Sequence, residues 1–409
     1  MSVNTQDRRV LREAAKRVAE IATLPIQEER RQMWYRHNRL ERVRPMILVF
    51  AEGAWRELLP QEEMLCEDPT LRGWEWHLKH LIYRHEHHHD DFVIEPHFNV
   101  PRVIRDTGWG VEVRHRPSSE ATGAWGFDPV IVEPEDLEKL CFPEVIYDEA
   151  ASARLFEWAQ DILGDLLHVR QKGDARASFH LMNFFCQLRG LEQVMMDMLD
   201  RPEWLHEAMS FLEEGFRGRN RQLEEMGLLD LNNEDDYVCS GGVGYSTELP
   251  AKDYDGRHVR MKDMWGFAEA QEMAQVSPEM HYEFILQYEK RLLEPFGLNT
   301  YGCCEDLTDK LEFVFQIPNL RRISISPWAD VARCAEKLKG DYIFSWKPHP
   351  SMLVGDFSPQ RIRAYLQHTM EVTQGCVIEM ILKDTHTCEH RPERFTIWTD
   401  IAQEVAAQA

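Results

Sequence analysis

Side chains able to carry out acid–base chemistry follow the last two segments that the sequence predicts to be buried strands. Lys347 and His349 come after one of these segments, and Asp384 and His386 come after the other. Lysine, histidine and aspartate all donate or accept protons in enzymes. If the strands are parallel and form a barrel, their carboxyl ends meet at one mouth. We therefore predict that Lys347, His349 and Asp384 are catalytic residues.

Other polar residues lie within predicted strands. His180 and Asn183 belong to the candidate strand 178–184, and we expect His180 to be catalytic and Asn183 to bind substrate. Glu379 and Glu95 lie inside strand patterns, where an ionisable group is costly unless it is paired. Each is therefore either a pocket residue or half of a buried pair, and we predict that Glu379 binds substrate.

Two further segments invite a functional interpretation. The glycine-rich stretch 239–245 lacks the strand and helix that flank a phosphate-binding loop, so we interpret it as a loop that covers substrate, with Tyr237 as a contact. The run 85–91, His-Glu-His-His-His-Asp-Asp, could bind metal. Because consecutive helical residues fan out, a solvated helix end is the better interpretation.

Composition narrows the possible partners. The 409 residues carry 47 Lys and Arg against 70 Asp and Glu, a formal charge of −23, which disfavours nucleic acid and anionic membranes. The first 26 residues lack a signal-peptide core, and the longest apolar runs, such as 46–50, are too short to span a bilayer. Nine cysteines without a framework spacing suit reduced thiols, so we expect a cytoplasmic protein.

Short β-rich runs alternate with helical patterns, which is typical of parallel βα units. The eight candidate strands are 46–50, 92–98, 178–184, 228–232, 298–302, 321–326, 342–346 and 377–382, with 237–240 as an alternative fourth strand. The prediction is a single (β/α)8 TIM-barrel domain over residues 1–409, of the α/β class.

Additions to this barrel are also predicted. Residues 1–40 form a helical extension, and a surface hairpin is inserted at about 107–135, with strands in 109–116 and 124–132. The helices expected with most definition are 191–199, 202–226, 278 to about 294 and the last one, which follows Pro392.

Several motifs resemble those of the uroporphyrinogen decarboxylase superfamily. They are Arg-Gly-Leu-Glu at 189–192, Asp-Arg-Pro-Glu at 200–203, Ser-Pro-Glu at 277–279, the cysteine-containing loop 301–305, Lys-Pro at 347–348 and Lys-Asp at 383–384. The resemblance runs from about residue 44 to near the end, and it implies a (β/α)8 barrel. The superfamily includes porphyrinogen decarboxylases and cobalamin-dependent methyltransferases, so the resemblance alone leaves the reaction open.

The decarboxylase branch carries arginines after the first strand that hold the substrate carboxylates. The corresponding stretch here, 50–56, has Glu52 and Ala54, and Arg56 is its sole cation. A carboxylate at Glu52 would repel a polycarboxylate substrate. We therefore expect no porphyrinogen decarboxylation, and we predict that Glu52 contacts another substrate.

The methyltransferase branch binds zinc through His-x-Cys at the end of the fifth strand and a cysteine near the C-terminus. By this resemblance, the candidate ligands are Cys303, Cys304, Glu305, His386 and Cys388, with Glu305 or His386 replacing the missing histidine. Adjacent strand residues point to opposite faces, so one of Cys303 and Cys304 should bind the metal.

The resemblance thus favours a zinc-assisted methyltransferase. It would move a methyl group from a small donor (an aryl methyl ether, methanol, a methylamine or a thiol) to a corrinoid carried by a partner protein. An aryl ether would suit a mouth containing Trp55, which we predict to bind substrate, with Tyr237, Trp265, Trp328 and Trp346. The alternatives are a lyase that decarboxylates a small carboxylate and a non-catalytic barrel that binds a tetrapyrrole or corrinoid. A homodimer is compatible with all three.

Overall fold

The computed structural model describes residues 4–118, 126–238 and 240–409. Its main feature is a seven-stranded parallel sheet in which the first strand pairs with the last. In spatial order the strands are β1 (Met46–Val49), β13 (Val377–Leu382), β12 (Ile343–Trp346), β11 (Leu320–Ile325), β10 (Leu298–Tyr301), β9 (Trp265–Ala268) and β8 (Ser178–Phe179). Pairing of the first and last strands is what a barrel requires.

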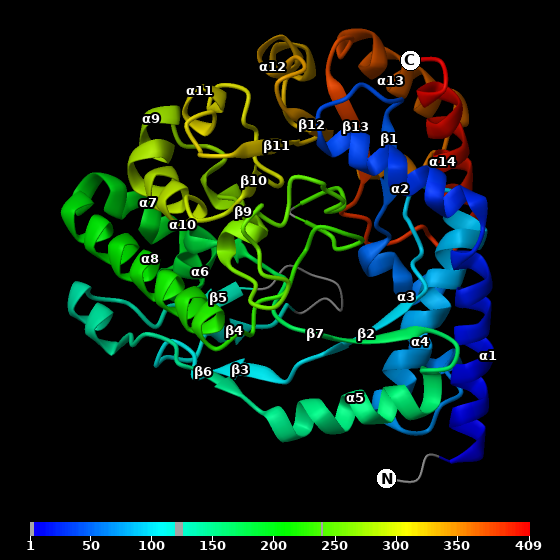
Figure 1. Ribbon diagram of the computed structural model, residues 1–409. Helices are drawn as coiled ribbons and strands as arrows, with labels where there is room; N and C mark the ends of the chain where they lie inside the picture. Colours follow the sequence, from blue (N-terminus) through cyan, green and yellow to red (C-terminus); the bar gives the residue numbers. More distant parts are fainter. Residues whose placement is uncertain (1–3, 119–125, 239) are drawn as a thin grey trace.

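The side between β1 and β8 is closed less regularly. A second parallel pair, β2 (His97–Pro101) with β7 (His168–Lys172), occupies it, and β7 runs on toward β8. The backbone N–H of Asp91, which precedes β2, donates to the carbonyl of Ile47 in β1 over 2.8 Å. The architecture is mixed α/β and compatible with an α/β barrel, although the assigned sheet stays open between β1 and β8 (Figure 1).

Helices surround the sheet (Figure 1). Those of the first half are α1 (Thr5–Ala22), α2 (Pro25–Asn38), α3 (Trp55–Leu58), α4 (Pro69–Tyr83), α5 (Glu149–Leu163), α6 (Leu181–Arg189), α7 (Leu191–Asp200) and α8 (Pro202–Glu225). Those of the second half are α9 (Pro278–His281), α10 (Gln287–Leu293), α11 (Leu311–Val314), α12 (Val331–Leu338), α13 (Pro359–Val372) and α14 (Glu393–Ala406). In the described part of the chain, no helix combines the length and apolar character that a membrane crossing requires.

The predicted N-terminal extension is helical and has a core of its own. Leu11 and Val18 of α1 are fully buried against Leu78 of α4 and Ile162 of α5. Apolar residues recur along one face of α1, which is the pattern of a helix that packs on a neighbour. The extension therefore covers the side of the molecule that carries β2 and β7 (Figure 1).

Five predicted strands are confirmed to within one residue, namely β1, β10, β11, β12 and β13. The predicted helices are confirmed as α7, α8, the run from α9 to α10, and α14. Ser277 caps the N-terminus of α9, and a π-helical turn at Tyr282–Leu286 interrupts that run. In α14, Phe395, Trp398 and Ile401 are buried as expected.

Three strand predictions need correction. The segment 228–232, predicted as the fourth strand, forms a single bridge to Asp174. The alternative, 237–240, is not the fourth strand of the sheet either, because β9 holds that position. Asn232 explains part of this, since its side chain bonds both the N–H and the carbonyl of Trp265 and so occupies backbone groups beside β9. The strand predicted at 178–184 ends at Phe179, and α6 begins two residues later. The strand predicted at 92–98 begins at His97.

The predicted hairpin is present. β4 (Arg114–Arg116) pairs antiparallel with β5 (Gly126–Asp128), and residues 119–123 of the predicted turn, 117–123, lie outside the described residues. A second antiparallel pair, β3 (Ile104–Asp106) with β6 (Val145–Tyr147), flanks it. The insertion therefore adds two small ribbons beside α8 (Figure 1).

Candidate active site

A cavity of about 800 Å³ lies where several parallel strands end. Glu52 follows β1, His180 follows β8, Cys303 follows β10 and Lys383 follows β13, and all four line it. Its other walls come from residues 172–178 and 265–267 and from Asn99, Pro101, Asn232, Asp236, Tyr237, Val238 and Ser240. The carboxyl ends of the strands thus meet at one mouth, where α/β barrels hold their active sites. The predicted substrate contact Glu52 is in place.

His180 is the predicted catalytic residue that the cavity accommodates best. It stands between β8 and α6, and its Nδ1 lies 2.5 Å from Oε1 of the buried carboxylate of Glu269. Burial alone would lower the pKa of His180, but the hydrogen bond to Glu269 and the charges of Glu269 and Cys303 raise it. The imidazole is therefore held in one orientation and favoured in its protonated form.

Cys303 faces the same cavity in a polar setting. Its Sγ lies 3.3 Å from Ser240 Oγ, 3.5 Å from Cys304 Sγ and 4.0 Å from Lys383 Nζ. The contact with the Cys304 thiol lowers the pKa of Cys303; burial opposes this, and the Lys383 charge adds to it. Cys303 is thus stabilised as a thiolate, and the same pairing raises the pKa of Cys304.

The expectation that Cys303 and Cys304 point to opposite faces is wrong. That geometry holds within a strand, but β10 ends at Tyr301, and both cysteines belong to the turn that follows Gly302 (φ 92°). The turn brings the two thiols side by side, and Cys304 donates to Asp384 over 3.6 Å.

Lys383 completes this side of the cavity. Its ammonium lies 3.3 Å from Ser240 Oγ, 3.6 Å from Asp384 Oδ1 and 4.0 Å from Glu52 Oε1. Burial opposes its charge, yet Cys303, Asp384 and Glu52 together raise the pKa of Lys383. Asp384, predicted to be catalytic, is thus a neighbour of both the cation and Cys304 and does not itself line the cavity.

Lys347 and His349, also predicted to be catalytic, lie outside the cavity lining. Lys347 is buried, with its Nζ donating to the carbonyl and hydroxyl oxygens of Ser345 at 3.0 and 2.9 Å. A Cβ on Gly241 would come within 3.1 Å of Nζ, so the glycine-rich stretch lies directly over this lysine. His349 accepts a hydrogen bond from the Ser351 hydroxyl and packs edge-on against Trp328.

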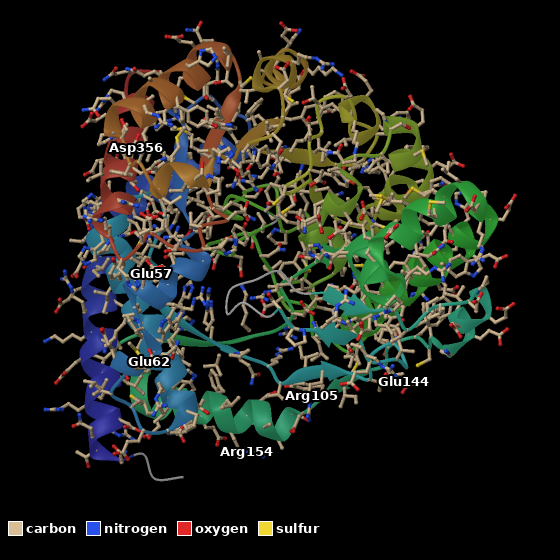
Figure 2. All side chains as sticks on the ribbon, turned by 180° about the vertical axis from the view of Figure 1, so that it is seen from behind. Glu57, Glu62, Arg105, Glu144, Arg154 and Asp356 are labelled. Carbon is tan, nitrogen blue, oxygen red and sulfur yellow. The ribbon has the colours of Figure 1, made fainter. Side chains whose placement is uncertain are left out.

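The five predicted zinc ligands do not converge on one point, although Cys303 and Cys304 are side by side. Glu305 is buried, and its carboxylate accepts from the N–H groups of Cys303 and Ala270 at 2.8 and 3.2 Å. Cys388 donates to Oε2 of Glu57, a residue of α3, over 3.1 Å (Glu57 is labelled in Figure 2). His386 is exposed beside Gly53. Within residues 4–118, 126–238 and 240–409, no three His, Cys, Asp or Glu side chains are grouped so as to hold a metal ion. The predicted ligand set therefore does not fit a zinc ion.

Three predicted substrate contacts lie elsewhere. Glu379 is buried inside the sheet, and its pKa, which burial raises, is brought down to about 2 by Arg322 and His37. It is thus half of a buried pair, and Glu95 likewise pairs with Arg31.

Trp55 packs edge-on against His80 and Tyr83, because α3 turns its side chain toward α4. Asn183 lies on α6 and donates to Glu272, without lining the cavity. Of the predicted aromatic mouth, Tyr237 and Trp265 line the cavity, whereas the structure places Trp328 on the surface and Trp346 in the core.

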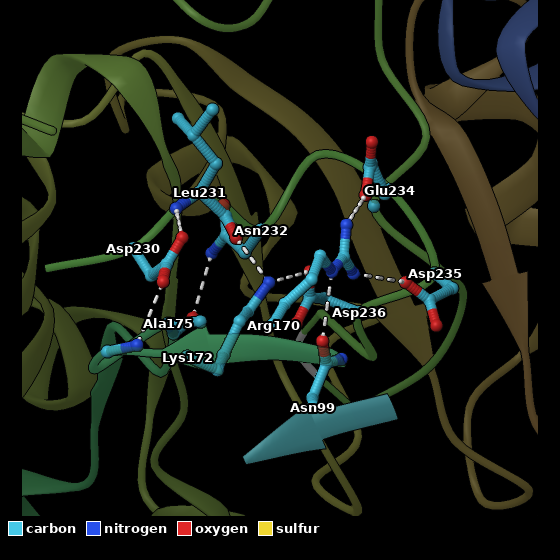
Figure 3. A network of polar contacts seen from close by, with 12 residues as sticks. Asn99, Arg170, Lys172, Ala175, Asp230, Leu231, Asn232, Glu234, Asp235 and Asp236 are labelled. Carbon is cyan, nitrogen blue, oxygen red and sulfur yellow. Dashed lines mark hydrogen bonds and ion pairs between the residues drawn. The ribbon is translucent and has the colours of Figure 1, made fainter. Parts of the chain in front are cut away.

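The wall opposite Cys303 was missed by sequence reasoning. There Lys172 of β7 donates to Asp236 Oδ2 and to the carbonyl of Leu231, at 2.9 and 2.8 Å (Figure 3). Asp230 accepts from the N–H of Gly173, which ties the 230–236 loop to the end of β7. β7 reads His-Val-Arg-Gln-Lys, which is too polar to indicate a buried strand.

Glu269 was missed for a related reason. It follows β9, a four-residue strand that reads Trp-Gly-Phe-Ala, and the sequence analysis placed the fourth strand elsewhere. The available signal was a short apolar segment followed directly by a glutamate. A buried carboxylate directly after such a segment is a candidate site residue.

Comparison with models of known protein families finds no match to this chain, and comparison with curated proteins finds none either. The superfamily resemblance of the sequence motifs therefore stays a prediction. Among solved structures, a methyltransferase from Methanosarcina mazei is similar, with 11% identity over 90% of this chain and 97% of that chain, and a TM-score of 0.49. A similarity this distant supports no conclusion about what this chain does.

Proposed function

We propose that this protein is a methyltransferase that removes a methyl group from a small donor with His180 as the proton donor. The observation that carries the proposal is the His180–Glu269 pair, at 2.5 Å, on the wall of a cavity at the carboxyl ends of the strands. A charged imidazole fixed by a buried carboxylate is a suitable general acid. The motif resemblance to corrinoid methyltransferases agrees with it.

The chemistry follows from the donor. When the methyl carbon of an ether is attacked, the C–O bond breaks and the leaving oxygen needs a proton. Nδ1 of His180 is engaged by Glu269, so Nε2 is the nitrogen that can supply this proton. Glu269 orients the ring and stabilises its charged form, and the exposed ring of Tyr237 offers apolar surface to an aryl donor.

The methyl acceptor in this proposal is a reduced corrinoid carried by a partner protein, which would supply the nucleophile. Zinc binding stays a prediction that metal analysis of the purified protein tests. Because its proposed ligands do not converge on one point and Glu305 is bonded to two backbone N–H groups, we assign no step to zinc. Protonation by His180 replaces the activation that a metal would give.

The first prediction tests His180. His180→Gln removes the proton donor and should lower the rate of labelled methyl transfer from an aryl methyl ether to added reduced cobalamin by about 10²–10⁴-fold. Because the pKa of His180 is raised, the wild-type rate should persist above the ordinary value of 6.5 and fall as pH rises through the raised pKa. The variant should lack this fall.

The matched control is His349→Gln, since His349 lies outside the cavity lining. It should retain the wild-type rate and pH profile. Methyl transfer by His180→Gln at the wild-type rate would contradict the assignment of His180 as the acid. If the wild-type protein transfers a methyl group from none of the four donor classes (methanol, a methylamine, a thiol or an aryl ether), the proposed methyltransferase function is contradicted.

One observation favours a second candidate. Lys172, Arg176 and Lys383 all line the cavity, and cations there could hold a carboxylate. A lyase that decarboxylates a small acid is therefore the alternative. Release of carbon dioxide from a carboxylate substrate, without methyl transfer, would favour it. Tight cobalamin binding with neither reaction would favour a non-catalytic barrel.

A further inference from the structure

The two thiols after β10 form an arrangement that the proposed methyl transfer does not use. Cys303 Sγ and Cys304 Sγ lie 3.5 Å apart, and both residues are half-buried. Cys303 lines the cavity, so a small molecule that enters the cavity reaches its sulfur. The pair therefore combines access with a second thiol already in contact.

The surroundings of the two sulfurs differ. Cys303 Sγ lies between the hydroxyl of Ser240 at 3.3 Å and the ammonium of Lys383 at 4.0 Å, both of which stabilise a negative sulfur. Cys304 instead points its S–H at the carboxylate of Asp384, 3.6 Å away, which keeps the proton on that sulfur. A reactive thiolate thus stands beside a protonated thiol, as in peroxide-sensitive cysteine pairs.

We propose that Cys303 and Cys304 form a modification site for small hydroperoxides, with Cys303 as the attacking and Cys304 as the resolving residue. The Cys303 thiolate attacks the terminal peroxide oxygen and the O–O bond breaks. The leaving alkoxide or hydroxide takes a proton from water and departs as the alcohol or water. Cys303 becomes a sulfenic acid. The Cys304 sulfur then attacks it, its proton joins the leaving hydroxyl as water, and a disulfide links the neighbours.

The local backbone suits this reaction. The sulfurs must approach from 3.5 Å to about 2.05 Å, which side-chain rotation in the turn after Gly302 can supply. Adjacent Cα atoms are about 3.8 Å apart, less than the usual span of a disulfide, so the bond should be readily reduced by a dithiol. The modification is therefore reversible, and it removes a negative sulfur from the cavity.

The chain offers an internal comparison. Cys141 is exposed, and its tryptic peptide, 140–154, contains no other cysteine. Cys303 and Cys304 share the peptide 292–310, again with no other cysteine. The exposed Cys141 thus provides a second thiol of the same chain whose rate of oxidation is measured in the same sample.

The experiment treats the reduced protein under argon with one equivalent of hydrogen peroxide, quenches it with N-ethylmaleimide over time, and maps the peptides by mass. Peptide 292–310 should lose about 2 Da, for two hydrogens, at least about tenfold faster than Cys141 is oxidised, and dithiothreitol should restore it. Equal rates at the two peptides, or a disulfide joining 292–310 to another peptide, would overturn the proposal.

Variants separate the two roles. Cys304→Ser should oxidise at the wild-type rate but stop at a sulfenic acid that dimedone traps, whereas Cys303→Ser should leave its peptide unreacted. Lys383→Met should slow the reaction, and Lys383→Arg, which keeps the charge, should restore most of the rate. Wild-type oxidation in Cys303→Ser would refute the attacking role. These readouts are independent of methyl transfer, so each proposal can fail alone.

Discussion

At the scale of residues, two pairs of charged groups shape the electrostatics of the cavity. Glu269 stabilises the protonated His180, and Lys383 stabilises the Cys303 thiolate on the neighbouring wall. The Cys303 charge in turn raises the pKa of His180. The cavity thus holds an acid and a thiolate whose charges support each other, which is the type of pairing found at functional sites.

The lowered pKa of Cys303 has a measurable consequence. Because the thiolate is the alkylated form, Cys303 should react with iodoacetamide at pH values where an ordinary thiol, of pKa 9.0, is almost unreactive. Lys383→Met removes a cation that lowers this pKa and should shift the profile to higher pH. Peptide mapping of 292–310 after timed alkylation measures it.

Lys383→Arg is the control for alkylation, since it preserves the charge beside the sulfur. Its profile should stay close to that of the wild-type protein. A Cys303 profile that coincides with that of a free thiol, or one that Lys383→Met leaves in place, would show that the thiolate is not held by this lysine.

The residue types at the site were partly predictable. His180 was singled out from a candidate strand, Tyr237 from the glycine-rich stretch, and Glu52 and Cys303 from the superfamily resemblance, and all four line the cavity. Lys347 was predicted to be catalytic but is buried beneath Gly241, outside the cavity lining. Long-range contacts of this kind have no signature in the sequence.

At the scale of elements, the predictability depends on how apolar each strand is. β13 reads Val-Ile-Glu-Met-Ile-Leu and is buried throughout. Its residues are apolar except for Glu379, so the sequence identifies it clearly as a buried strand. β8 has two residues, and β7 is mostly polar, so neither carries a buried-strand pattern. Tertiary pairing forms those strands, and local sequence therefore places them poorly.

The π-helical turn at Arg84–His88 contains a buried histidine, His88, whose protonation opposes folding. His88 is buried among Trp55, Tyr83 and Phe395, and neither ring nitrogen has a hydrogen-bond partner among the described residues. Burial lowers its pKa well below 6.5. The predicted solvated helix end is thus wrong for this residue.

The lowered pKa of His88 makes the stability of the protein depend on pH. In the unfolded chain His88 gains a proton as pH falls below 6.5, while the folded protein excludes it, so stability is lost on acidification. The loss is about 1.4 kcal/mol per pH unit below the unfolded value for one such group. His88→Phe should reduce the slope of unfolding free energy against pH between 6.5 and 5.

Urea unfolding at several pH values measures this slope. The exposed His368 on α13 provides the control, and His368→Phe should leave the slope as in the wild-type protein. Equal slopes in His88→Phe and wild type would show that another group, rather than this imidazole, governs acid stability.

At the scale of the whole molecule, a buried ionic cluster joins the N-terminal extension to the sheet. Glu379 of β13 lies 3.0 Å from Arg322 of β11 and 3.1 Å from His37 of α2. Asn38 adds to it by accepting from Arg322 and donating to the carbonyls of Val243 and Tyr245. The end of α2, the interior of the sheet and the glycine-rich loop are therefore fixed to one another.

This arrangement separates the structural role of Glu379 from the substrate-binding role that the sequence predicts. Glu379→Gln leaves the Arg322 charge buried without its partner, and breaking one side of a buried pair costs about 3–5 kcal/mol. We expect a loss of that size in the unfolding free energy, measured by urea titration. Glu336→Gln, at an exposed position on α12, should change the unfolding free energy by less than about 0.5 kcal/mol.

Because Glu379 does not line the cavity, the Glu379→Gln variant should bind a methyl donor with the wild-type KM under conditions in which it is folded. A raised KM at unchanged stability would instead establish Glu379 as a substrate contact and would require the cavity to extend through the sheet to Arg322.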